Sequence, residues 1–319
     1  MAEKVKIGFI GAGGMANAVH YPSLAKMEDV EIVGICDLDE KRLNETAEKY
    51  KIRNRFTDYK EMIRKTSLDA VYIIMPPHHL FDIVIECLKN KLNIFVEKPP
   101  GVMKEQTKQI ALLAEKNHCL SMVSFQRRFS PVTVKARSIV EERGPIIQCM
   151  VTFVKNYTGG PYYDGASDIL TCDVIHAVDN LRWMCGEVKR LRASVRNLYM
   201  DYDNSFNAIV EFESGAIGFL VSNFIVGKRI FSQEMHSKGI SAYIEPEVRA
   251  VIYKDNKEEG IILESSEVAG SKELYHIGGF YAENRHFIDC LKDKKNPMTN
   301  FTDACKTMEL VDRIYHSEI

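Results

Sequence analysis

A glycine-rich turn directly after a short apolar run constrains the fold of this chain more than any other feature of its sequence. The run Lys6–Ile10 reads as a buried strand, and the next six residues, GAGGMA, have the spacing G-x-G-x-x-A. In this spacing the first glycine permits a tight turn, the second admits a pyrophosphate to the backbone, and the final small residue lets a helix pack closely on the strand. The free N–H groups and the dipole of that helix favour an anion. The pattern predicts a dinucleotide-binding turn, with a plain tight turn as the alternative, and its cofactor-binding residues are Gly11, Gly13, Gly14, Met15 and Ala16.

The first 122 residues alternate short β-branched runs with longer amphipathic stretches, as β-α-β units around a parallel sheet do. The strand-like runs are Lys6–Ile10, Glu31–Cys36, Ala70–Met75, Asn93–Val96 and Leu120–Ser124. The stretches with a helical spacing of apolar residues are Lys41–Tyr50, Tyr59–Thr66, Leu80–Asn90 and Lys104–Asn117. We therefore predict a Rossmann-type, doubly wound α/β domain over residues 1–122.

A second domain is predicted from about Gly144, because strand-like runs then follow one another without an intervening helix. Examples are Ile146–Phe153, Ala208–Phe212, Ala216–Asn223 and Arg249–Tyr253. The series indicates an α+β domain over residues 123–280 with a mostly antiparallel open sheet and one helical insertion, Ile169–Met184. From Tyr281 the chain returns to helical periodicity. The length of 319 residues suits two compact domains.

The charge balance and the cysteines bear on partners and compartment. With 42 Lys and Arg against 44 Asp and Glu the formal net charge is −2, which gives no field for nucleic acid or an anionic membrane, so the expected partner is a small molecule. The eight cysteines form no Cys-x-x-Cys pair, and the histidines show no zinc-finger spacing, so no metal is expected. The N-terminal residues do not resemble a signal peptide, and no segment reads as a membrane span. These features predict a cytoplasmic protein.

Asp37 ends the second predicted strand, where a carboxylate can accept both ribose hydroxyls of NAD and repel the 2′-phosphate of NADP. The alternative role is a turn or helix cap, for which Asp39 is the better candidate. NAD is therefore the expected cofactor. Lys41 and Arg42 lie close enough to leave NADP as an alternative.

Glu97-Lys98-Pro99 ends the fourth predicted strand, and ligands of open α/β sheets bind at the carboxyl ends of the strands. Together with the glycine turn, three further segments carry a resemblance to a known family: Val71–Pro76 (VYIIMP), Phe125–Phe129 (FQRRF) and His176–Trp183 (HAVDNLRW). Over nearly its whole length the chain resembles the Gfo/Idh/MocA oxidoreductases.

The resemblance implies that Lys98 lies near the nicotinamide and the substrate hydroxyl and that His176 is the acid/base. The alternatives are a surface lysine before a turn and a core histidine on a half-buried helix. The motifs that carry the resemblance also hold further candidates, which are Pro76, Glu97, Lys98 and Gln126 for the cofactor and Arg127 for the substrate. Tyr163, in the loop before the His176 helix, and Asn180, on that helix, are two more substrate-binding candidates.

The chain departs from the family pattern at two positions. An aspartate usually stands four residues before the histidine; Cys172 occupies that position here, and Asp173 stands three before. At 100° per residue Asp173, His176 and Asn180 would form one polar stripe on a helix, so Asp173 remains a catalytic candidate. A histidine that members often carry after the third predicted strand is replaced by Phe81, although His78 and His79 come just before it.

The expected reaction is reversible hydride transfer between the nicotinamide and a secondary hydroxyl or ketone of a sugar, cyclitol or related polyol. An NAD-assisted hydrolase or lyase of the same fold and a non-catalytic NAD-binding regulator are the alternatives. The loop residues Tyr157, Tyr162, Tyr163 and Asp164 either line a sugar pocket or are ordinary loop residues.

The resemblance also implies that residues 281–319 pack back onto the first domain. It further implies a homodimer or homotetramer formed through the second-domain sheet. The uncharged stretch Gly215–Gly227 fits this expectation, because a long bare strand of this kind would aggregate.

Overall fold

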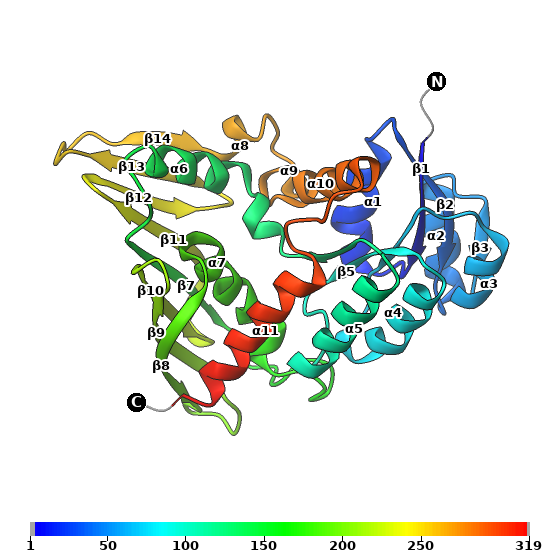
Figure 1. Cartoon of the computed structure of the whole chain (residues 1–319), viewed down its shortest axis with the longest axis horizontal. Coiled ribbons are helices and arrows are strands. Elements are labelled where there is room, and N and C mark those ends of the chain that lie inside the picture. Colours follow the sequence, from blue (N-terminus) through cyan, green and yellow to red (C-terminus); the bar gives the residue numbers. More distant parts are fainter. Residues whose placement is uncertain (1–3, 318–319) are drawn as a thin grey trace. The chain divides into compact units, whose positions relative to one another are not determined.

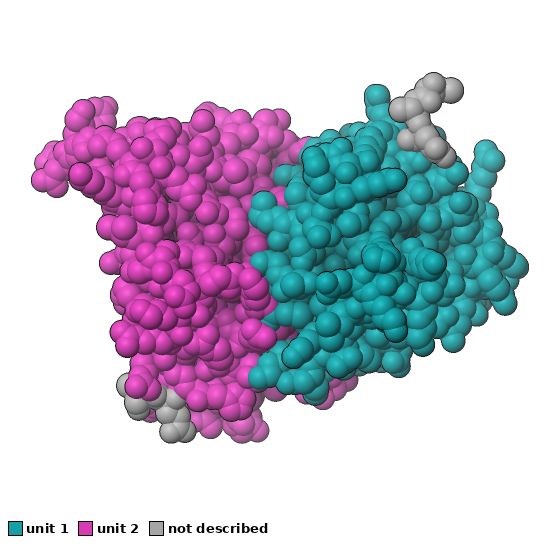
Figure 2. Space-filling model, in the orientation of Figure 1, with its two compact units in different colours: residues 1–125, 280–305 teal, residues 126–279, 306–319 magenta. Residues whose placement is uncertain are grey.

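The computed structural model describes residues 4–317 of the chain and divides them into two compact units (Figure 2). Unit 1 comprises residues 4–125 and 280–305, and unit 2 comprises residues 126–279 and 306–317. Residues 306–317, which were assigned to the first domain with the rest of residues 281–319, group instead with unit 2, and residues 318–319 lie outside the described residues. Apolar periodicity predicted these helices correctly but carries no information about which surface covers their apolar faces.

Unit 1 is built on a six-stranded parallel sheet of order β3-β2-β1-β4-β5-β6, which confirms the doubly wound fold (Figure 1). The strands are β1 (Val5–Ile10), β2 (Val30–Cys36), β3 (Asn54–Phe56), β4 (Ala70–Ile73), β5 (Asn93–Glu97) and β6 (Ser121–Ser124). The helices are α1 (Tyr21–Ala25), α2 (Glu40–Lys49), α3 (Tyr59–Lys65), α4 (Leu80–Lys89), α5 (Lys104–Lys116) and α10 (Phe280–Asp293). The sequence did not reveal β3, because three residues are too few for a period-2 pattern.

The core of unit 1 combines the apolar strands with a row of aromatic rings. Tyr21, Phe9, Tyr72 and Phe95 are fully buried and form a stack in this order. The centroids of neighbouring rings in the stack are 4.1 to 5.0 Å apart. Helix α10 packs on α1, β1 and β6. This core fixes the carboxyl ends of β1, β2 and β5, where the predicted cofactor residues lie.

Unit 2 contains an eight-stranded sheet of order β14-β13-β12-β11-β7-β10-β9-β8, in which only the β7–β10 pair is parallel. The strands are β7 (Gln148–Asn156), β8 (Val188–Arg196), β9 (Ser205–Phe212), β10 (Ile217–Asn223), β11 (Ile225–Ser237), β12 (Ile240–Glu245), β13 (Arg249–Lys254) and β14 (Ile261–Glu264). The helices are α6 (Pro131–Glu141), α7 (Ile175–Cys185), α8 (Ser265–Val268), α9 (Leu274–Ile277) and α11 (Phe301–Tyr315), which begins in unit 1. The predicted α+β class is confirmed, although the sequence reading missed α6.

One face of this sheet is covered and the other is open. Helix α7 packs on β7 and β10, and α6 packs on β11, β12 and β13. The strand register places Ile209, Val221, Tyr243 and Tyr253 on the opposite face, where all four are exposed. The stretch Gly215–Gly227 was expected to be one long strand, but it forms β10 and the start of β11, and β10 pairs on both sides. The open feature of unit 2 is therefore a sheet face and not a strand edge.

Candidate functional site

The glycine turn has the geometry that a dinucleotide needs. Gly11 has φ +114°, and a Cβ there would lie 2.1 Å from the carbonyl oxygen of Ile74, so only glycine fits. A Cβ at Gly13 or Gly14 would meet no atom within 4 Å, which leaves the backbone open for a ligand. A hollow of about 350 Å³ adjoins the turn, and its lining residues are Ala12, Gly13, Gly14, Asn17, Arg42, Glu45, Thr46 and Lys49. The residues present fit a pyrophosphate.

Asp37 faces this turn from the end of β2. Its Oδ2 accepts a hydrogen bond from the backbone N–H of Ala12 at 2.7 Å, and its Oδ1 accepts from Asp39 N–H at 2.8 Å and Arg42 Nη2 at 3.1 Å. Asp39 caps α2 by accepting from the N–H groups of Lys41 and Arg42, as predicted. Asp39 therefore serves as the helix cap, while Asp37 contacts the glycine turn, and the ribose role of Asp37 stays a prediction.

Glu97 and Lys98 follow one another at the carboxyl end of β5, and the Lys98–Pro99 peptide bond is cis. Glu97 is buried; its Oε2 accepts from the backbone N–H of Lys98 at 3.1 Å, and its Oε1 lies 2.9 Å from His20 Nε2. Burial opposes ionisation, but the hydrogen bond and charge of His20, with Lys98 and Ser124, hold the pKa of Glu97 below its ordinary value. Both Glu97 carboxylate oxygens are thus engaged within the chain, Oε1 with His20 and Oε2 with the backbone N–H of Lys98, whose position it fixes.

A second carboxyl completes this buried network. Ser124 Oγ donates to Glu283 Oε1 at 2.7 Å, and His20 Nδ1 lies 3.4 Å from the Asn284 amide oxygen. Burial and the nearby charge of Glu97 raise the pKa of Glu283 well above its ordinary value. We name the set His20, Glu97, Ser124, Glu283 and Asn284 the Glu97 network. Sequence reasoning missed every member except Glu97, because the contacts join segments that are far apart in the chain.

In unit 2 the predicted helical insertion begins with a π-helical turn, Leu170–Val174, and α7 follows. Asp173 lies in the π turn, where the chain turns by less than the assumed 100° per residue, so the stripe of Asp173, His176 and Asn180 stays a prediction. Asp173 forms an ion pair with Lys155 of β7 and accepts from Tyr162 OH at 2.7 Å. Burial and then Asp173 raise the pKa of Tyr162, so its hydroxyl keeps the proton that it donates.

The predicted residues of α7 are buried. His176 is 6% exposed and Asn180 is fully buried. The Asn180 amide oxygen accepts from Gln233 Nε2, and Gln233 in turn accepts from Thr133 Oγ1 at 3.0 Å. Asn180 therefore packs inside unit 2, and its substrate-binding role stays a prediction.

Arg127 follows β6 in a short 3₁₀ segment, and its guanidinium carbon lies 3.7 Å from the centroid of the Phe231 ring. Its nearest carboxylate contact is Glu247 Oε1, 3.6 Å from Nη2. Burial lowers the pKa of Arg127 to about 10, and the charge of Glu247 offsets this only in part. Of the remaining predicted residues, Gln126 is buried, Pro76 is half-buried after β4, and Met15 and Tyr163 are exposed.

Within residues 4–317 no group of three or more His, Cys, Asp or Glu side chains could hold a metal ion. No helix in this part of the chain combines the length and the apolar character that a membrane span requires.

Comparison with known proteins identifies the class. The model of the oxidoreductase family with an NAD-binding Rossmann fold (GFO_IDH_MocA) matches residues 5–125, and the GFO/IDH/MocA C-terminal domain model matches residues 141–237. The fold, the glycine turn and these matches define an NAD-binding oxidoreductase. The chain belongs to the Gfo/Idh/MocA family, which confirms the resemblance, and it is an NAD-dependent dehydrogenase.

Individual relatives span most of the chain. The myo-inositol 2-dehydrogenase of Thermotoga maritima is 23% identical over 318 residues, which cover 94% of this chain and 92% of that protein. A dehydrogenase from Chromobacterium violaceum has a TM-score of 0.90 at 20% identity and covers 99% of this chain and 96% of its own. Levoglucosan dehydrogenase in complex with NADH has a TM-score of 0.86 at 18% identity, with 98% and 96% covered.

Proposed function

We propose that this protein reversibly oxidises a secondary hydroxyl of a sugar, cyclitol or related polyol to a ketone. The names of the relatives, an inositol dehydrogenase and a levoglucosan dehydrogenase, support this substrate class. The observation that carries the proposal is Lys98, a cation at the carboxyl end of a parallel strand whose backbone is held by a buried carboxylate. A bound NAD would supply the hydride acceptor for this oxidation.

The chain's own residues handle the proton and the charge. His176 takes the hydroxyl proton in oxidation and returns it in reduction. Lys98 stabilises the negative charge that develops on the same oxygen. Asp173, already paired with Lys155 and Tyr162, acts as a polar neighbour of this chemistry in unit 2.

The remaining roles are assigned by position. The glycine turn holds the pyrophosphate, Asp37 accepts the ribose hydroxyls, and Pro76 and Gln126 contact the cofactor. Glu97 is a positioning residue for Lys98. Arg127, Tyr163 and Asn180 bind the substrate, with Arg127 carrying the strongest support because its guanidinium is buried and poorly paired.

A substrate panel tests the proposal. Polyols with NAD and keto-sugars with NADH are followed by NADH absorbance, and we expect stoichiometric turnover of cofactor with at least one secondary alcohol. Product formed without net change in NADH would identify a hydrolase or lyase that returns its hydride. Tight NADH binding with no reaction of any panel member would favour a non-catalytic regulator.

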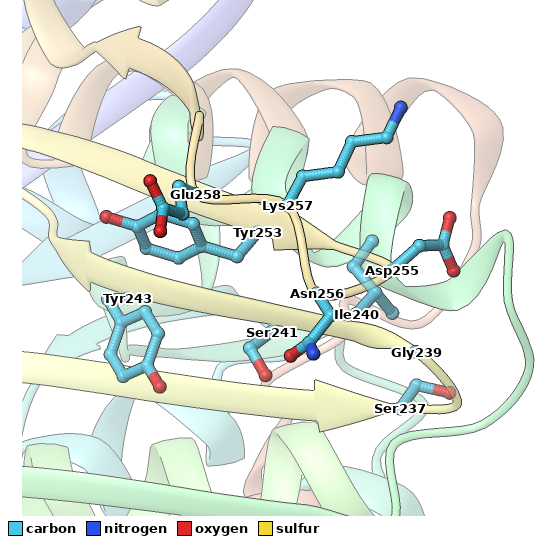
Figure 3. A pocket seen from close by; sticks show the side chains of 10 residues that line it. All are labelled: Ser237, Gly239, Ile240, Ser241, Tyr243, Tyr253, Asp255, Asn256, Lys257 and Glu258. Carbon is cyan, nitrogen blue, oxygen red and sulfur yellow. The ribbon is translucent and has the colours of Figure 1, made fainter.

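We also propose that two or four copies associate through the open face of the unit 2 sheet. Exposed apolar side chains on that face, Ile209 and Val221 among them, support this. The same face carries a hollow of about 610 Å³ beside Tyr243 and Tyr253, and its lining contains none of the predicted site residues (Figure 3). Sedimentation equilibrium should give a multiple of the 36.4 kDa chain mass; a monomer at micromolar concentration would contradict the proposal. We propose a cytoplasmic location as well, which is supported by the eight cysteines, because none of them forms a disulfide among residues 4–317.

A further inference from the structure

Unit 2 buries a cation that its own residues do not fully pair. The Arg127 side chain is only 8% exposed, and its Nε has no hydrogen-bond partner among the described residues. Its contact with Glu247 is 3.6 Å, longer than a charge-assisted hydrogen bond. A buried guanidinium with five donors normally finds closer acceptors, because an unsatisfied charged donor is costly.

Glu247 is also shared with a second arginine. Arg229 Nη1 lies 3.5 Å from Glu247 Oε2, so one carboxylate serves two guanidinium groups. Arg229 and Glu247 are 47% and 40% exposed, which shows that water reaches this end of the group. We name Arg127, Arg229 and Glu247 the Arg127 cluster.

The neighbouring ion pair does not supply the missing negative charge. Lys155 and Arg229 lie 5.9 Å and 5.7 Å from the same Phe153 ring, and Asp173 acts electrostatically on Arg127. Asp173, however, is already paired with Lys155. Among these five side chains, three cations, Arg127, Arg229 and Lys155, face two anions, Asp173 and Glu247, an excess of one positive charge.

We propose that the Arg127 cluster binds a carboxylate of the substrate, so that the hydroxyl oxidised belongs to a sugar acid or another polyhydroxy acid. This inference rests on the proposed function, because it names the substrate class of that same site. A carboxylate matches the planar fork of a guanidinium and can engage two of its donors at once. Its single charge equals the excess, whereas a phosphate monoester carries roughly two negative charges at neutral pH.

Matched pairs of compounds test the inference: glucose with glucuronate, galactose with galacturonate, and sorbitol with gluconate. For each pair we measure kcat/KM with NAD and, by calorimetry, binding to the NADH complex. We expect at least one acid to exceed its neutral partner about tenfold or more in kcat/KM. A neutral partner that is equal or better in every pair, in turnover and in binding, overturns the inference.

The experiment distinguishes failure of the carboxylate site from failure of the proposed dehydrogenase reaction. Oxidation of neutral polyols without any preference for the acids would contradict the carboxylate site but support the proposed dehydrogenase function. An acid that binds tightly while no panel compound is oxidised would support the carboxylate site and contradict the proposed reaction.

Three variants sharpen the result. Arg127→Met keeps an apolar stem against Phe231 and should reduce the acid-to-neutral ratio to within about threefold, because loss of a buried charged partner typically costs on the order of 10²-fold. Glu247→Gln removes the competing carboxylate and should raise the ratio, an effect that loss of packing does not produce. Arg190→Met, on an exposed arginine paired with Glu211, is the matched control and should leave the ratio unchanged. An unchanged ratio in Arg127→Met or a lowered ratio in Glu247→Gln overturns the inference.

Discussion

The two units bury charge in opposite ways. In unit 1 we call the Glu97 network closed, because Glu97 is paired with His20, and burial together with the charge of Glu97 raises the pKa of the second carboxyl, Glu283. In unit 2 the Arg127 cluster is open, because one carboxylate is shared by two arginines and the contact to Arg127 is long.

The difference shows what each region is suited to do. In a closed network the polar groups form hydrogen bonds with other groups of the chain, and here these bonds fix the backbone position of Lys98. An open cluster keeps donors available, so it suits recognition of a group that arrives from outside. Substitutions in unit 1 should therefore change chemistry or stability, and those around Arg127 should change the choice of substrate.

The largest expected effect is that of His176→Ala on turnover. General acid–base catalysis typically contributes about 10²–10⁴-fold, so kcat should fall by that range while NADH affinity changes little. His236→Ala, which removes another histidine of unit 2 that contacts Ser241, is the control for packing. If His176→Ala lowers the melting temperature and spares turnover, His176 is a packing residue, and Asp173 or Lys98 must move the proton.

Lys98→Met tests the residue whose backbone the Glu97 network holds in place. Removing a preorganised charge typically costs on the order of 10²–10³ in turnover, and methionine keeps most of the apolar stem. Lys98→Arg should also fail, since a planar guanidinium does not replace a compact ammonium. Lys104→Met, at the start of α5, is the control. A near-normal single-turnover rate of hydride transfer in Lys98→Met would contradict the proposed mechanism but not the fold or the cofactor assignment.

Local features of unit 1 were predictable from the sequence. The turn at Gly11, the cap at Asp39 and the strand ends at Asp37 and Glu97 each depend on a few consecutive residues, whose backbone requirements are visible in their order. Apolar periodicity likewise identified the long helices of unit 1 within a residue or two.

Contacts between distant segments were not predictable in this way. His20 lies 77 residues from Glu97, and Ser124 lies 159 residues from Glu283, so no local pattern connects them. The π turn before His176 shifts side-chain directions by an amount that a 3.6-residue period cannot anticipate. Residues 306–317 group with unit 2 through tertiary contacts, which include the bonds from Thr307 Oγ1 to Asp179 Oδ1 at 2.9 Å and from Arg182 Nη1 to Thr307 Oγ1 at 2.9 Å.

Glu283→Gln tests the Glu97 network through the pH dependence of the free energy of unfolding. Because the folded pKa is raised, folded Glu283 keeps a proton that the unfolded chain loses above about 4.5, and stability falls as the pH rises from there to the folded pKa. A neutral amide abolishes that fall, so the variant's advantage in unfolding free energy should grow by about 1–3 kcal/mol between pH 5 and pH 7. Urea unfolding at several pH values gives the difference. Glu97→Gln should have the opposite sign at neutral pH, since Glu97 is charged in the folded protein, and a pH-independent difference for Glu283→Gln would contradict a neutral Glu283.

The smallest expected effect concerns cofactor choice at Asp37. Its carboxylate meets a 2′-phosphate as a like charge and neutralises the nearby cation, because Arg42 Nη2 is bound to Asp37 Oδ1. Asp37→Ser removes the repulsion and frees Arg42, which is 55% exposed, so the preference for NADH over NADPH should narrow by about tenfold, or roughly 1.4 kcal/mol. Fluorescence titration of both cofactors measures the ratio. Asp39→Ser is the matched control, because it removes the same charge from the start of α2, keeps a side chain that can cap the helix and should change the ratio less. Tighter binding of NADPH than NADH by the unmodified protein would contradict the ribose role of Asp37 and assign the phosphate to Arg42.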